Sequence, residues 1–314
     1  MLKDKQPPPI YDGVAVLIPC YNEERTIGKV VTEFKHVFSG SKIFVFDNNS
    51  TDKTAIIAQE SGATVIHAPH QGKGNVVKQM FAEIEADIYI MVDGDDTYPA
   101  FSAPDLIAEF NKGRADMVVG VRTSSFDEHS FRRFHHLGNR LVASLISSLF
   151  SVKLTDVMSG YRVISKAFVK SVPLVSKGFE IEIEMTLQAL AKHFVIKEMA
   201  IPYGKRPDGS YSKLNTYSDG FLVLKSIFMI FKDYKPLVFF SLLSAVLFLI
   251  TITAGILPVL DYIKTRFVSH IPLAILATGT GILSVLSLSI GLILDTISKY
   301  HNENFELLRR LLKK

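Results

Sequence analysis

Three clusters of acidic and amide side chains lie near the start of the chain, each directly after a short apolar run. PCYNE (19–23) follows VAVLI, DNNSTD (47–52) follows KIFVF, and DGDD follows IYIMV. In the third cluster Asp93, Asp95 and Asp96 repel one another unless a cation lies among them. Such oxygen ligands suit Mg²⁺ or Mn²⁺, which usually also bind substrate phosphates. We therefore expect metal-assisted chemistry on a phosphate compound, the simpler alternative being a polar turn or a helix cap.

Several other sites and partners are excluded by the same sequence. A dinucleotide-binding turn needs G-x-G-x-x-G after the first strand, but residues 19–23 contain no glycine, and GKGNVV at Gly72 lacks the third one. The phosphate-loop pattern G-x-x-x-x-G-K-[ST] does not occur. The single cysteine, Cys20, excludes an intrachain disulfide or a cysteine zinc cluster. The net charge of +4 is too small to indicate nucleic-acid binding.

Alternating strands and helices must position these clusters. The residue patterns predict strands at 14–18, 42–46, 64–68, 88–92 and 116–121, and helices at 24–38, 51–62 and 74–86. Ser50 or Thr51 is expected to cap the second helix. The alternation favours an α/β, Rossmann-like, doubly wound and mostly parallel sheet. Ligands of such sheets bind at the carboxyl ends of the strands, where the three polar clusters fall.

The C-terminal part of the chain is far more apolar than the rest. Residues 236–260 and 267–294 contain no Asp, Glu, Lys or Arg, and the mean hydropathy of the whole chain is +0.24. A membrane-spanning helix needs about 20 apolar residues. We therefore expect a transmembrane hairpin with helices at 236–260 and 271–295, rather than two buried core helices. Gly279 and Gly281 would let the two helices approach closely.

Basic residues predict the orientation of this hairpin. The connecting loop 261–270 carries only Lys264 and Arg266. More basic residues flank the outer ends of the hairpin: Lys225, Lys232, Lys235, Lys299, Arg309, Arg310, Lys313 and Lys314. The positive-inside rule then puts both termini in the cytoplasm, with the chain multi-pass in the cytoplasmic membrane. MLKDKQPPP lacks an apolar core, so we expect no signal peptide.

The expected domains follow from these limits. They are an N-terminal tail (1–13), a cytoplasmic catalytic head (14–216), an amphipathic juxtamembrane helix (217–235), the two spans with an extracytoplasmic loop (261–270), and a basic cytoplasmic tail (296–314). The stretches 220–235 and 131–151 combine basic and apolar residues. Both are expected to contact the headgroup region of a bilayer, or else to pack on the head.

Five motifs in order resemble a known enzyme family. PCYNE, DNNSTD and DGDD at strand ends are similar to inverting family-2 nucleotide-sugar glycosyltransferases of the GT-A fold. DVMSGYR (156–162) resembles the D-x-x-S-G-[FY]-R element of dolichyl-phosphate mannose synthases and bacterial polyprenyl-phosphate glycosyltransferases. GFEIEIEM (178–185) resembles their acidic helix, and RPDGSYSKL (206–214) their R-x-x-G-x-S-K-L element. The resemblance to this dolichyl-phosphate mannose synthase-like group covers residues 14 to about 220, and many members share the two-helix tail.

The resemblance implies roles for the matching residues. For the nucleotide sugar these are Pro19, Tyr21, Glu23, Asp47, Lys73, Asp93, Gly94, Arg206 and Lys213. For the acceptor phosphate they are Arg122, Arg132 and Arg133. The catalytic residues are Asp95 and Arg122, and the metal, Mg²⁺ or Mn²⁺, is expected on Asp95, Asp93 and Thr97. Many mannose synthases have Gln at the Thr97 position, so the ligands beyond Asp95 stay open. Lys73 can equally be a solvated lysine, and Arg162 a structural arginine.

The implied reaction moves a sugar from a nucleotide sugar to polyprenyl (undecaprenyl or dolichyl) phosphate, for cell-envelope glycan or glycoprotein assembly. The donor is expected to be a UDP-hexose or UDP-N-acetylhexosamine, with GDP-mannose as the alternative. A phosphate monoester has a second pKa of about 6 and is mostly ionised at neutral pH. It therefore needs cations rather than a general base, and in-line attack would invert the anomeric carbon. A lipid acceptor also accounts for the hairpin.

Three alternatives remain open. A processive polysaccharide synthase would carry a Gln-x-x-Arg-Trp motif, but the chain has no Trp. A transferase acting on a sugar hydroxyl would need a carboxylate base, for which Glu180, Glu182 and Glu184 are candidates, 180 and 184 sharing one helical face. A non-enzymatic membrane tether would not need these motifs together. The expected partners are a nucleotide sugar, polyprenyl phosphate, the lipid bilayer and further copies of the chain in a homo-oligomer, but no nucleic acid.

Overall fold

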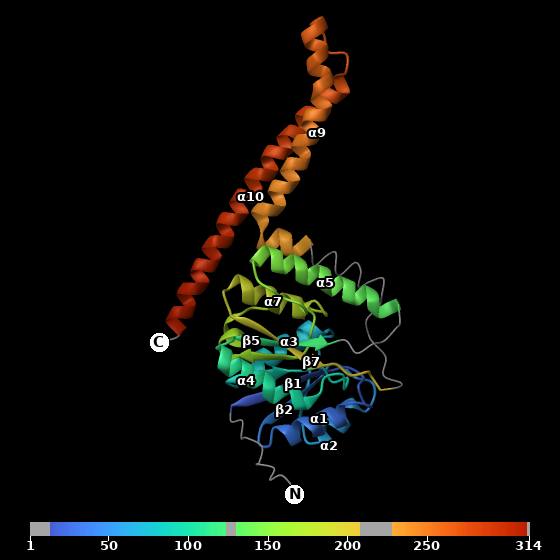
Figure 1. Cartoon of the computed structure of the whole chain (residues 1–314), viewed down its shortest axis with the longest axis vertical. Coiled ribbons are helices and arrows are strands. Elements are labelled where there is room, and N and C mark those ends of the chain that lie inside the picture. The colour runs from blue at the N-terminus through green and yellow to red at the C-terminus, as the bar shows by residue number, and fades with distance from the viewer. Residues whose placement is uncertain (1–12, 124–129, 208–227, 313–314) are drawn as a thin grey trace. The chain divides into compact units, whose positions relative to one another are not determined.

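The computed structural model describes residues 13–123, 130–207 and 228–312 (Figure 1). For residues 130–137, 230–231 and 308–312 it describes the backbone alone. The chain divides into two compact units, Met1–Ser226 and Ile227–Lys314. Lys213 and most of the juxtamembrane stretch 217–235 lie outside the described residues, as do the side chains of Arg132 and Arg133.

The first unit is built on a seven-stranded sheet in the order β3-β2-β1-β4-β6-β5-β7. Its strands are β1 (Val14–Cys20), β2 (Lys42–Asp47), β3 (Thr64–His67), β4 (Ile88–Met91), β5 (Met117–Thr123), β6 (Arg162–Ser165) and β7 (Ile196–Pro202). β6 runs antiparallel to both of its neighbours, β4 and β5, and the other pairs are parallel. The expected doubly wound, mostly parallel sheet is therefore confirmed.

Helices connect these strands and cover the sheet, with α1 and α2 on one side and α7 on the other (Figure 1). They are α1 (Ile27–Val37), α2 (Thr54–Glu60), α3 (Lys73–Glu83), the 3₁₀ helix η1 (Ala100–Ser102), α4 (Ala103–Gly113), α5 (Ser130–Phe150), α6 (Lys166–Ser171) and α7 (Ile181–Ala191). The three helices expected in this part of the chain all form, with later starts for the first two. The predicted capping of α2 by Ser50 or Thr51 is wrong. Instead, Asp52 accepts hydrogen bonds from the Thr54 backbone and hydroxyl, and Ser50 Oγ accepts one from Asn22 N.

β1 is buried on both faces, as its continuous apolar sequence predicts. Val14, Val16, Ile18 and Cys20 point into one hydrophobic core, which also contains the apolar face of α1. Ala15 and Leu17, on the other face of the strand, are also buried. A strand covered on both sides has little freedom to shift, so the turn that follows it is held firmly.

The strand order reverses direction beside β1. The chain moves outward from β1 to β2 and β3, then returns to add β4 on the other side of β1. In open α/β sheets ligands bind at this reversal, outside the carboxyl ends of the strands. The turns after β1 and β4, residues 19–23 and 93–97, meet there.

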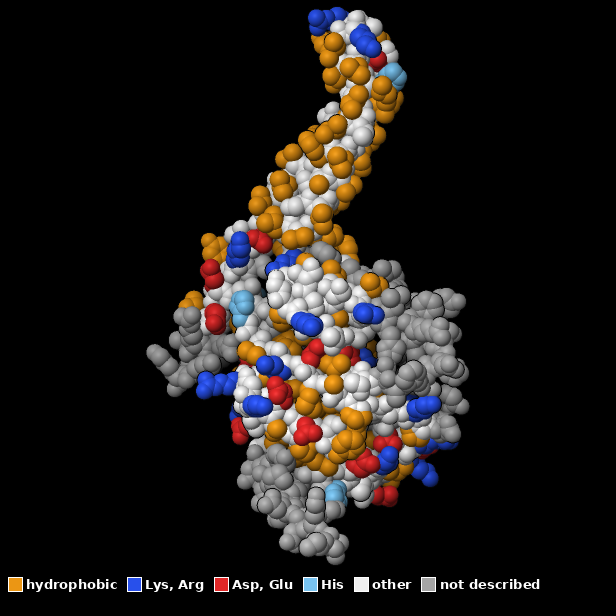
Figure 2. Space-filling view, in the orientation of Figure 1, with side chains coloured by type: hydrophobic (Ala, Val, Ile, Leu, Met, Phe, Trp, Pro, Cys, Tyr) orange, Lys and Arg blue, Asp and Glu red, His pale blue; other side chains and the backbone are white. Residues whose placement is uncertain are grey.

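The second unit contains two long apolar helices, α9 (Pro236–Thr265) and α10 (Ile271–Leu312), preceded by a short π-helix, η2 (Ile230–Tyr234). Both long helices are long and apolar enough to cross a membrane, and little of their most apolar stretches is buried in the protein. Figure 2 shows hydrophobic side chains over this part of the surface. The two helices can therefore form the expected transmembrane hairpin.

Small and hydroxyl-bearing side chains join α9 to α10. Ser244 Oγ lies 3.0 Å from Ser284 Oγ, and Thr251 Oγ1 lies 2.9 Å from Thr280 Oγ1. A Cβ on Gly281 would lie 3.3 Å from Thr251, so this glycine does allow close approach. The same expectation for Gly279 is wrong, because no described atom lies within 4 Å of a Cβ built there.

Candidate active site

The acidic turn after β4 is pressed against the end of β1. A Cβ on Gly94 would lie 2.6 Å from Cys20 Sγ, so a larger residue does not fit there. Thr26, next to the start of α1, donates a hydrogen bond of 2.7 Å to the Gly94 carbonyl oxygen. The glycine of DGDD therefore lets the turns after β1 and β4 touch.

Asp95 is the most enclosed acid of this turn, with 4% of its surface exposed. Thr97 donates to its Oδ1 from both the backbone N, at 3.2 Å, and the hydroxyl, at 2.5 Å. Arg206, beyond the end of β7, lies 2.5 Å from its Oδ2. Both oxygens of Asp95 are thus held by charge and hydrogen bonds from two separate segments.

Asp93 belongs to a second ion-pair cluster, which reaches α7. Lys73 Nζ at the start of α3 lies 2.6 Å from Asp93 Oδ1 and 2.5 Å from Glu182 Oε1. Burial raises the pKa of Glu182 above its ordinary value, although Lys73 acts in the opposite direction. Lys73 is therefore an enclosed side chain between two carboxylates, and its reading as a solvated lysine is wrong.

The turn after β2 fixes the turn after β1. Asn22 N donates to Ser50 Oγ at 2.9 Å, and Glu23 N donates to Thr54 Oγ1 at 2.8 Å. Asn22 Oδ1 in turn accepts from Thr51 N at 2.8 Å. PCYNE and DNNSTD are therefore one hydrogen-bonded surface, as their shared position at parallel strand ends predicts.

Asp47, the last residue of β2, has an unsatisfied oxygen. Its Oδ2 accepts from Ser50 N at 3.3 Å, whereas its buried Oδ1 has no hydrogen-bond partner among the described residues. A buried acceptor without a donor is costly, so such an atom usually has a partner that a protein-only structure lacks. A ligand N–H group would satisfy it.

Arg122 near the end of β5 forms a bidentate pair with Asp156. Its Nε and NH2 both lie 2.8 Å from the carboxylate oxygens, and its guanidinium lies 5.6 Å from the ring centre of Tyr203. Burial raises the pKa of Asp156, but the hydrogen bonds and charge of Arg122 lower it below the ordinary value overall. DVMSGYR therefore supplies the acid that orients Arg122.

Arg162 ends the same motif but lies in the interior. It is completely buried and donates to the Ser159 and Val157 carbonyls and to the Thr186 hydroxyl. These contacts agree with the interpretation of Arg162 as a structural arginine.

Some of the site residues predicted from the sequence therefore lie together in one region. The structure brings the residues after β1, β2 and β4 together, with Arg206 and Lys73 on the acids after β4. Sequence reasoning missed Asp156 as the partner of Arg122 and Glu182 as the partner of Lys73. Asp156 opens a motif that could have indicated it, whereas the IEIE pattern alone does not separate Glu182 from Glu180 and Glu184.

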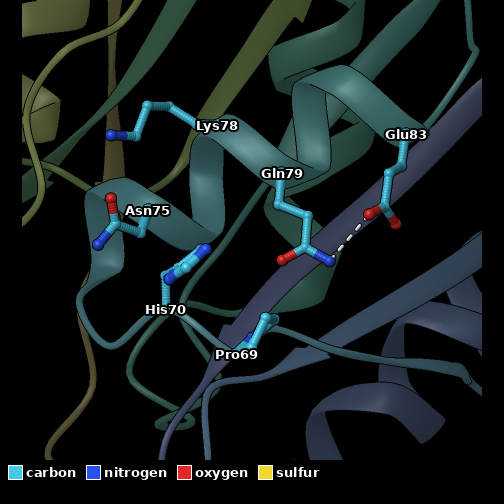
Figure 3. A pocket seen from close by; sticks show the side chains of 6 residues that line it. All are labelled: Pro69, His70, Asn75, Lys78, Gln79 and Glu83. Carbon is cyan, nitrogen blue, oxygen red and sulfur yellow. Dashed lines mark hydrogen bonds between the residues drawn. The ribbon is translucent and has the colours of Figure 1, made fainter.

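None of these acids lines the groove of about 510 Å³ shown in Figure 3. Its lining comes from the loop after β3 and from α3: Pro69, His70, Asn75, Lys78, Gln79 and Glu83. Gln79 donates to Glu83 at 2.9 Å along α3. None of the residues predicted for chemistry lines the groove, so we assign it no part in the active site.

The donor set around Asp95 fits a divalent cation only together with a phosphate ligand. The described residues contain no group of three or more His, Cys, Asp or Glu side chains placed to hold a metal. Mg²⁺ is usually held by one or two carboxylates plus substrate phosphates and water, so a single firmly positioned acid is sufficient. Thr97 orients this acid through its hydroxyl.

Comparison with known families gives a match over half of the chain. The profile of the glycosyl transferase family 2 matches residues 15–172. Protein RfbJ of Shigella flexneri is 53% identical over 123 residues, which are 39% of this chain and 95% of RfbJ. Glycosyltransferase AglJ of Haloferax volcanii is 27% identical over 96% of this chain and 99% of its own length. A dolichyl-phosphate hexose transferase of the same organism is 29% identical over 69% of this chain and 93% of its own length.

Solved structures share the fold of the head. Glucosyl-3-phosphoglycerate synthase of Mycobacterium tuberculosis, in complex with Mn²⁺, UDP and phosphoglyceric acid, superposes with a TM-score of 0.59. The match covers 70% of this chain and 78% of that chain at 20% identity. At this identity the likeness concerns the fold alone, and it confirms the expected GT-A fold.

Proposed function

Since this chain belongs to the glycosyl transferase family 2, we propose that it moves a sugar from a nucleotide sugar to a polyprenyl phosphate. The observation that carries this proposal is the joining, in one chain, of an acidic strand-end site to two helices apolar enough to span a bilayer. An acceptor held in the bilayer by its lipid chain would account for those helices. The relative named dolichyl-phosphate hexose transferase supports the same acceptor class.

The donor would bind across the turns after β1, β2 and β4. Asp47 would accept a hydrogen bond from the base on its unsatisfied Oδ1. The other nucleoside contacts would come from Pro19, Tyr21 and Glu23, and Asp93 and Gly94 would lie along the nucleotide. Arg206 and Lys213 would hold the diphosphate through charge-assisted hydrogen bonds.

A divalent cation, Mg²⁺ or Mn²⁺, would be held by Asp95, and when bound it would neutralise charge on the leaving diphosphate. Thr97 fixes one oxygen of Asp95, and Arg206, which covers the other in this structure, would move from it to the diphosphate when the metal binds. Asp93 and Thr97 remain candidates for further ligands. The crystallised Mycobacterium tuberculosis enzyme with Mn²⁺ and UDP supports a divalent ion in this fold.

The acceptor phosphate would be held by Arg122, with Arg132 and Arg133. Arginine suits this task because its planar fork pairs with two phosphate oxygens. Arg122 is already oriented by Asp156, which leaves the guanidinium pre-positioned. An ionised acceptor phosphate would attack the anomeric carbon without losing a proton to the protein, as the bond from that carbon to the nucleoside diphosphate breaks. In-line attack would invert the configuration at that carbon.

Transfer to a sugar hydroxyl fits the site less well. It would need a free carboxylate as general base. Of the three acids considered for that role, Glu182 is paired with Lys73, and Glu184 accepts hydrogen bonds from Val175 N and Ser176 N. Of the three, this leaves Glu180, the residue before α7, as the candidate base, and the contacts of the other two favour the phosphate acceptor.

The location follows from the same proposal. A polyprenyl phosphate keeps its chain in the bilayer, so the head would work on the cytoplasmic side, where nucleotide sugars are made available. Both termini would then be cytoplasmic, as the basic residues predict. Assembly into a homo-oligomer stays a prediction.

The decisive experiment offers the purified full-length chain, in detergent with Mg²⁺ or Mn²⁺, a panel of labelled UDP sugars and GDP-mannose. Undecaprenyl phosphate is the acceptor, and undecaprenol, which lacks only the phosphate, is the matched control. We expect a glycolipid from the phosphate alone, and its loss in EDTA. Equal labelling of the alcohol would contradict the assignment of a phosphate acceptor. An undiminished amount of product in EDTA would contradict the requirement for a divalent metal.

A further inference from the structure

The ion-pair cluster of Lys73, Asp93 and Glu182 joins three parts of the head that are distant in sequence. The lysine begins α3, one acid follows β4, and the other lies on α7. The exposed fractions of the three side chains are 11%, 26% and 4%, in that order. Asp93 is therefore the end of the cluster that faces solvent and the active site.

Two glycines allow this cluster to form. A Cβ on Gly74 would overlap the Ser176 carbonyl oxygen, and a Cβ on Gly72 would overlap that of Lys177. Gly74 N donates to the carbonyl oxygens of both Lys177 and Gly178, each at 3.1 Å. The GKG turn thus lies against the segment that leads into α7, and from there Lys73 reaches Glu182.

The charges of the cluster depend on one another. One ammonium lies between two carboxylates, so the group carries a net charge of −1 when both acids are ionised. Burial alone would lower the pKa of Lys73, but the charges of Asp93 and Glu182 raise it above its ordinary value. Removing the lysine alone would leave Glu182 buried without its ion-pair partner, which is strongly destabilising.

Asp93 is fixed from two sides. Lys73 holds its Oδ1, and a Cβ on Gly160 would lie only 2.5 Å from its Oδ2. The carboxylate is therefore wedged between the ammonium and the Gly160 backbone. Gly94 and Asp95 follow directly, so this arrangement fixes the point at which the acidic turn begins.

We propose that Lys73 is a positioning residue: paired with Glu182, it fixes Asp93, and through Asp93 it sets the acidic turn that receives the donor. The inference rests on the proposed function, because it assumes that Asp93 lies along the nucleotide sugar. In this proposal the GKG turn stabilises the conformation of the active site. Lys73 acts on the substrate only through Asp93 and does not contact the phosphates itself.

A double-mutant cycle tests this without leaving an unpaired acid in the interior. One change is the pair swap Lys73→Met with Glu182→Gln, which removes one charge of each sign and keeps the net charge. The other change is Asp93→Asn. The four proteins are the wild type, the pair swap, Asp93→Asn and the triple variant. Steady-state kinetics for the donor and the acceptor are measured in each, together with thermal unfolding.

We expect the pair swap to lower kcat/KM for the donor at least about tenfold when Asp93 is present, because small misplacements at a reacting site are costly. In the Asp93→Asn background the same swap should change kcat/KM for the donor less than about threefold, because the effects of residues that act as one unit are not additive. The acceptor KM should not change. A control swap of exposed charges, Lys166→Met with Glu85→Gln, should retain full activity. Glu85 also pairs with Lys170 at 2.7 Å, and Lys170 is left unchanged.

Other outcomes overturn the inference. Equal losses in both backgrounds would show that Lys73 or Glu182 acts on the substrate independently of Asp93. Full activity of a folded pair-swap protein would show that the cluster serves stability alone. An inactive wild type with every donor would overturn the proposed function, and the inference with it, whereas active wild type with additive losses would overturn the inference alone.

Discussion

At the scale of single residues, the acids of the site are held by cations from other segments. Asp95 is paired with Arg206, Asp93 with Lys73, Asp156 with Arg122, and Asp96 with Lys29. Several carboxylates can lie this close because each has its own counter-charge. An incoming diphosphate or metal ion must therefore exchange with charges already present, and this exchange can be measured.

The first prediction concerns Arg206 and metal binding. Because Arg206 covers Oδ2 of Asp95, a cation binding there must displace it. We expect Arg206→Gln to bind Mn²⁺ alone more tightly than wild type, yet to transfer sugar more slowly because a diphosphate ligand is lost. Titration calorimetry of the full chain in detergent, without nucleotide, measures the affinity.

Lys29→Gln is the matched control, since Lys29 lies 2.8 Å from Asp96 in the same turn. If this control tightened Mn²⁺ binding as much as Arg206→Gln, the effect would be a general one of charge. If Arg206→Gln left the Mn²⁺ affinity unchanged, the assignment of the metal to Asp95 would fail.

The second prediction concerns Arg122 and the acceptor. We expect Arg122→Ala to raise the KM for polyprenyl phosphate far more than the KM for the nucleotide sugar, because of the two substrates Arg122 would contact only the acceptor. Arg122→Lys keeps the charge but not the bidentate geometry, so its KM for polyprenyl phosphate should lie between those of the wild type and Arg122→Ala. Thermal unfolding is measured in parallel, since Asp156 loses its partner. Equal effects on both substrates would reassign Arg122.

At the scale of elements, the site is assembled from turns that follow parallel strands and from close approaches that only glycine permits. Gly94 lets the turn after β4 touch β1, and Gly74 lets α3 meet the segment before α7.

The helix α10 continues well beyond residue 295, where the sequence predicts the end of the second span, and includes residues predicted only as a basic tail. Its 42 residues extend roughly 63 Å at about 1.5 Å per residue, twice the thickness of a bilayer core.

The third prediction tests the approach at Gly74. We expect Gly74→Ala to destabilise the head by about 1–3 kcal/mol, because its methyl group would overlap the Ser176 carbonyl oxygen. Gly113→Ala is the control, since the nearest atom to a Cβ there is 3.4 Å away. Denaturant unfolding of the full chain measures both. Equal stability of the two variants would contradict the tight contact.

At the scale of the whole molecule, one chain combines a GT-A head with an apolar helical pair. Each unit has its own internal packing. The hairpin is closed by hydroxyl contacts such as Ser244 with Ser284, while most of its apolar surface remains outward. Apolar surface of this extent is typical of a membrane-embedded segment.

The fourth prediction concerns orientation across the membrane. The only cysteine, Cys20, is buried, so an introduced cysteine is a clean reporter. We expect Ser269→Cys, in the connection between α9 and α10, to react with an impermeant maleimide in intact cells. Glu60→Cys, at the exposed end of α2, should react only after permeabilisation. The reverse pattern would invert the topology.

The sequence by itself determined the first five strands, the helices that join the first four of them, the apolar helical pair and the residue types at the strand ends. Those features rest on local periodicity and on the shared edge of parallel strands, both of which are readable from short stretches. Only the tertiary structure decided which charges meet: Lys73 with Glu182, Arg122 with Asp156, and Arg206 with Asp95. These partners are far apart in the chain, and many pairings satisfy the same composition. Packing selects one pairing, because a buried charge is costly unless a counter-charge or hydrogen-bonding groups lie against it.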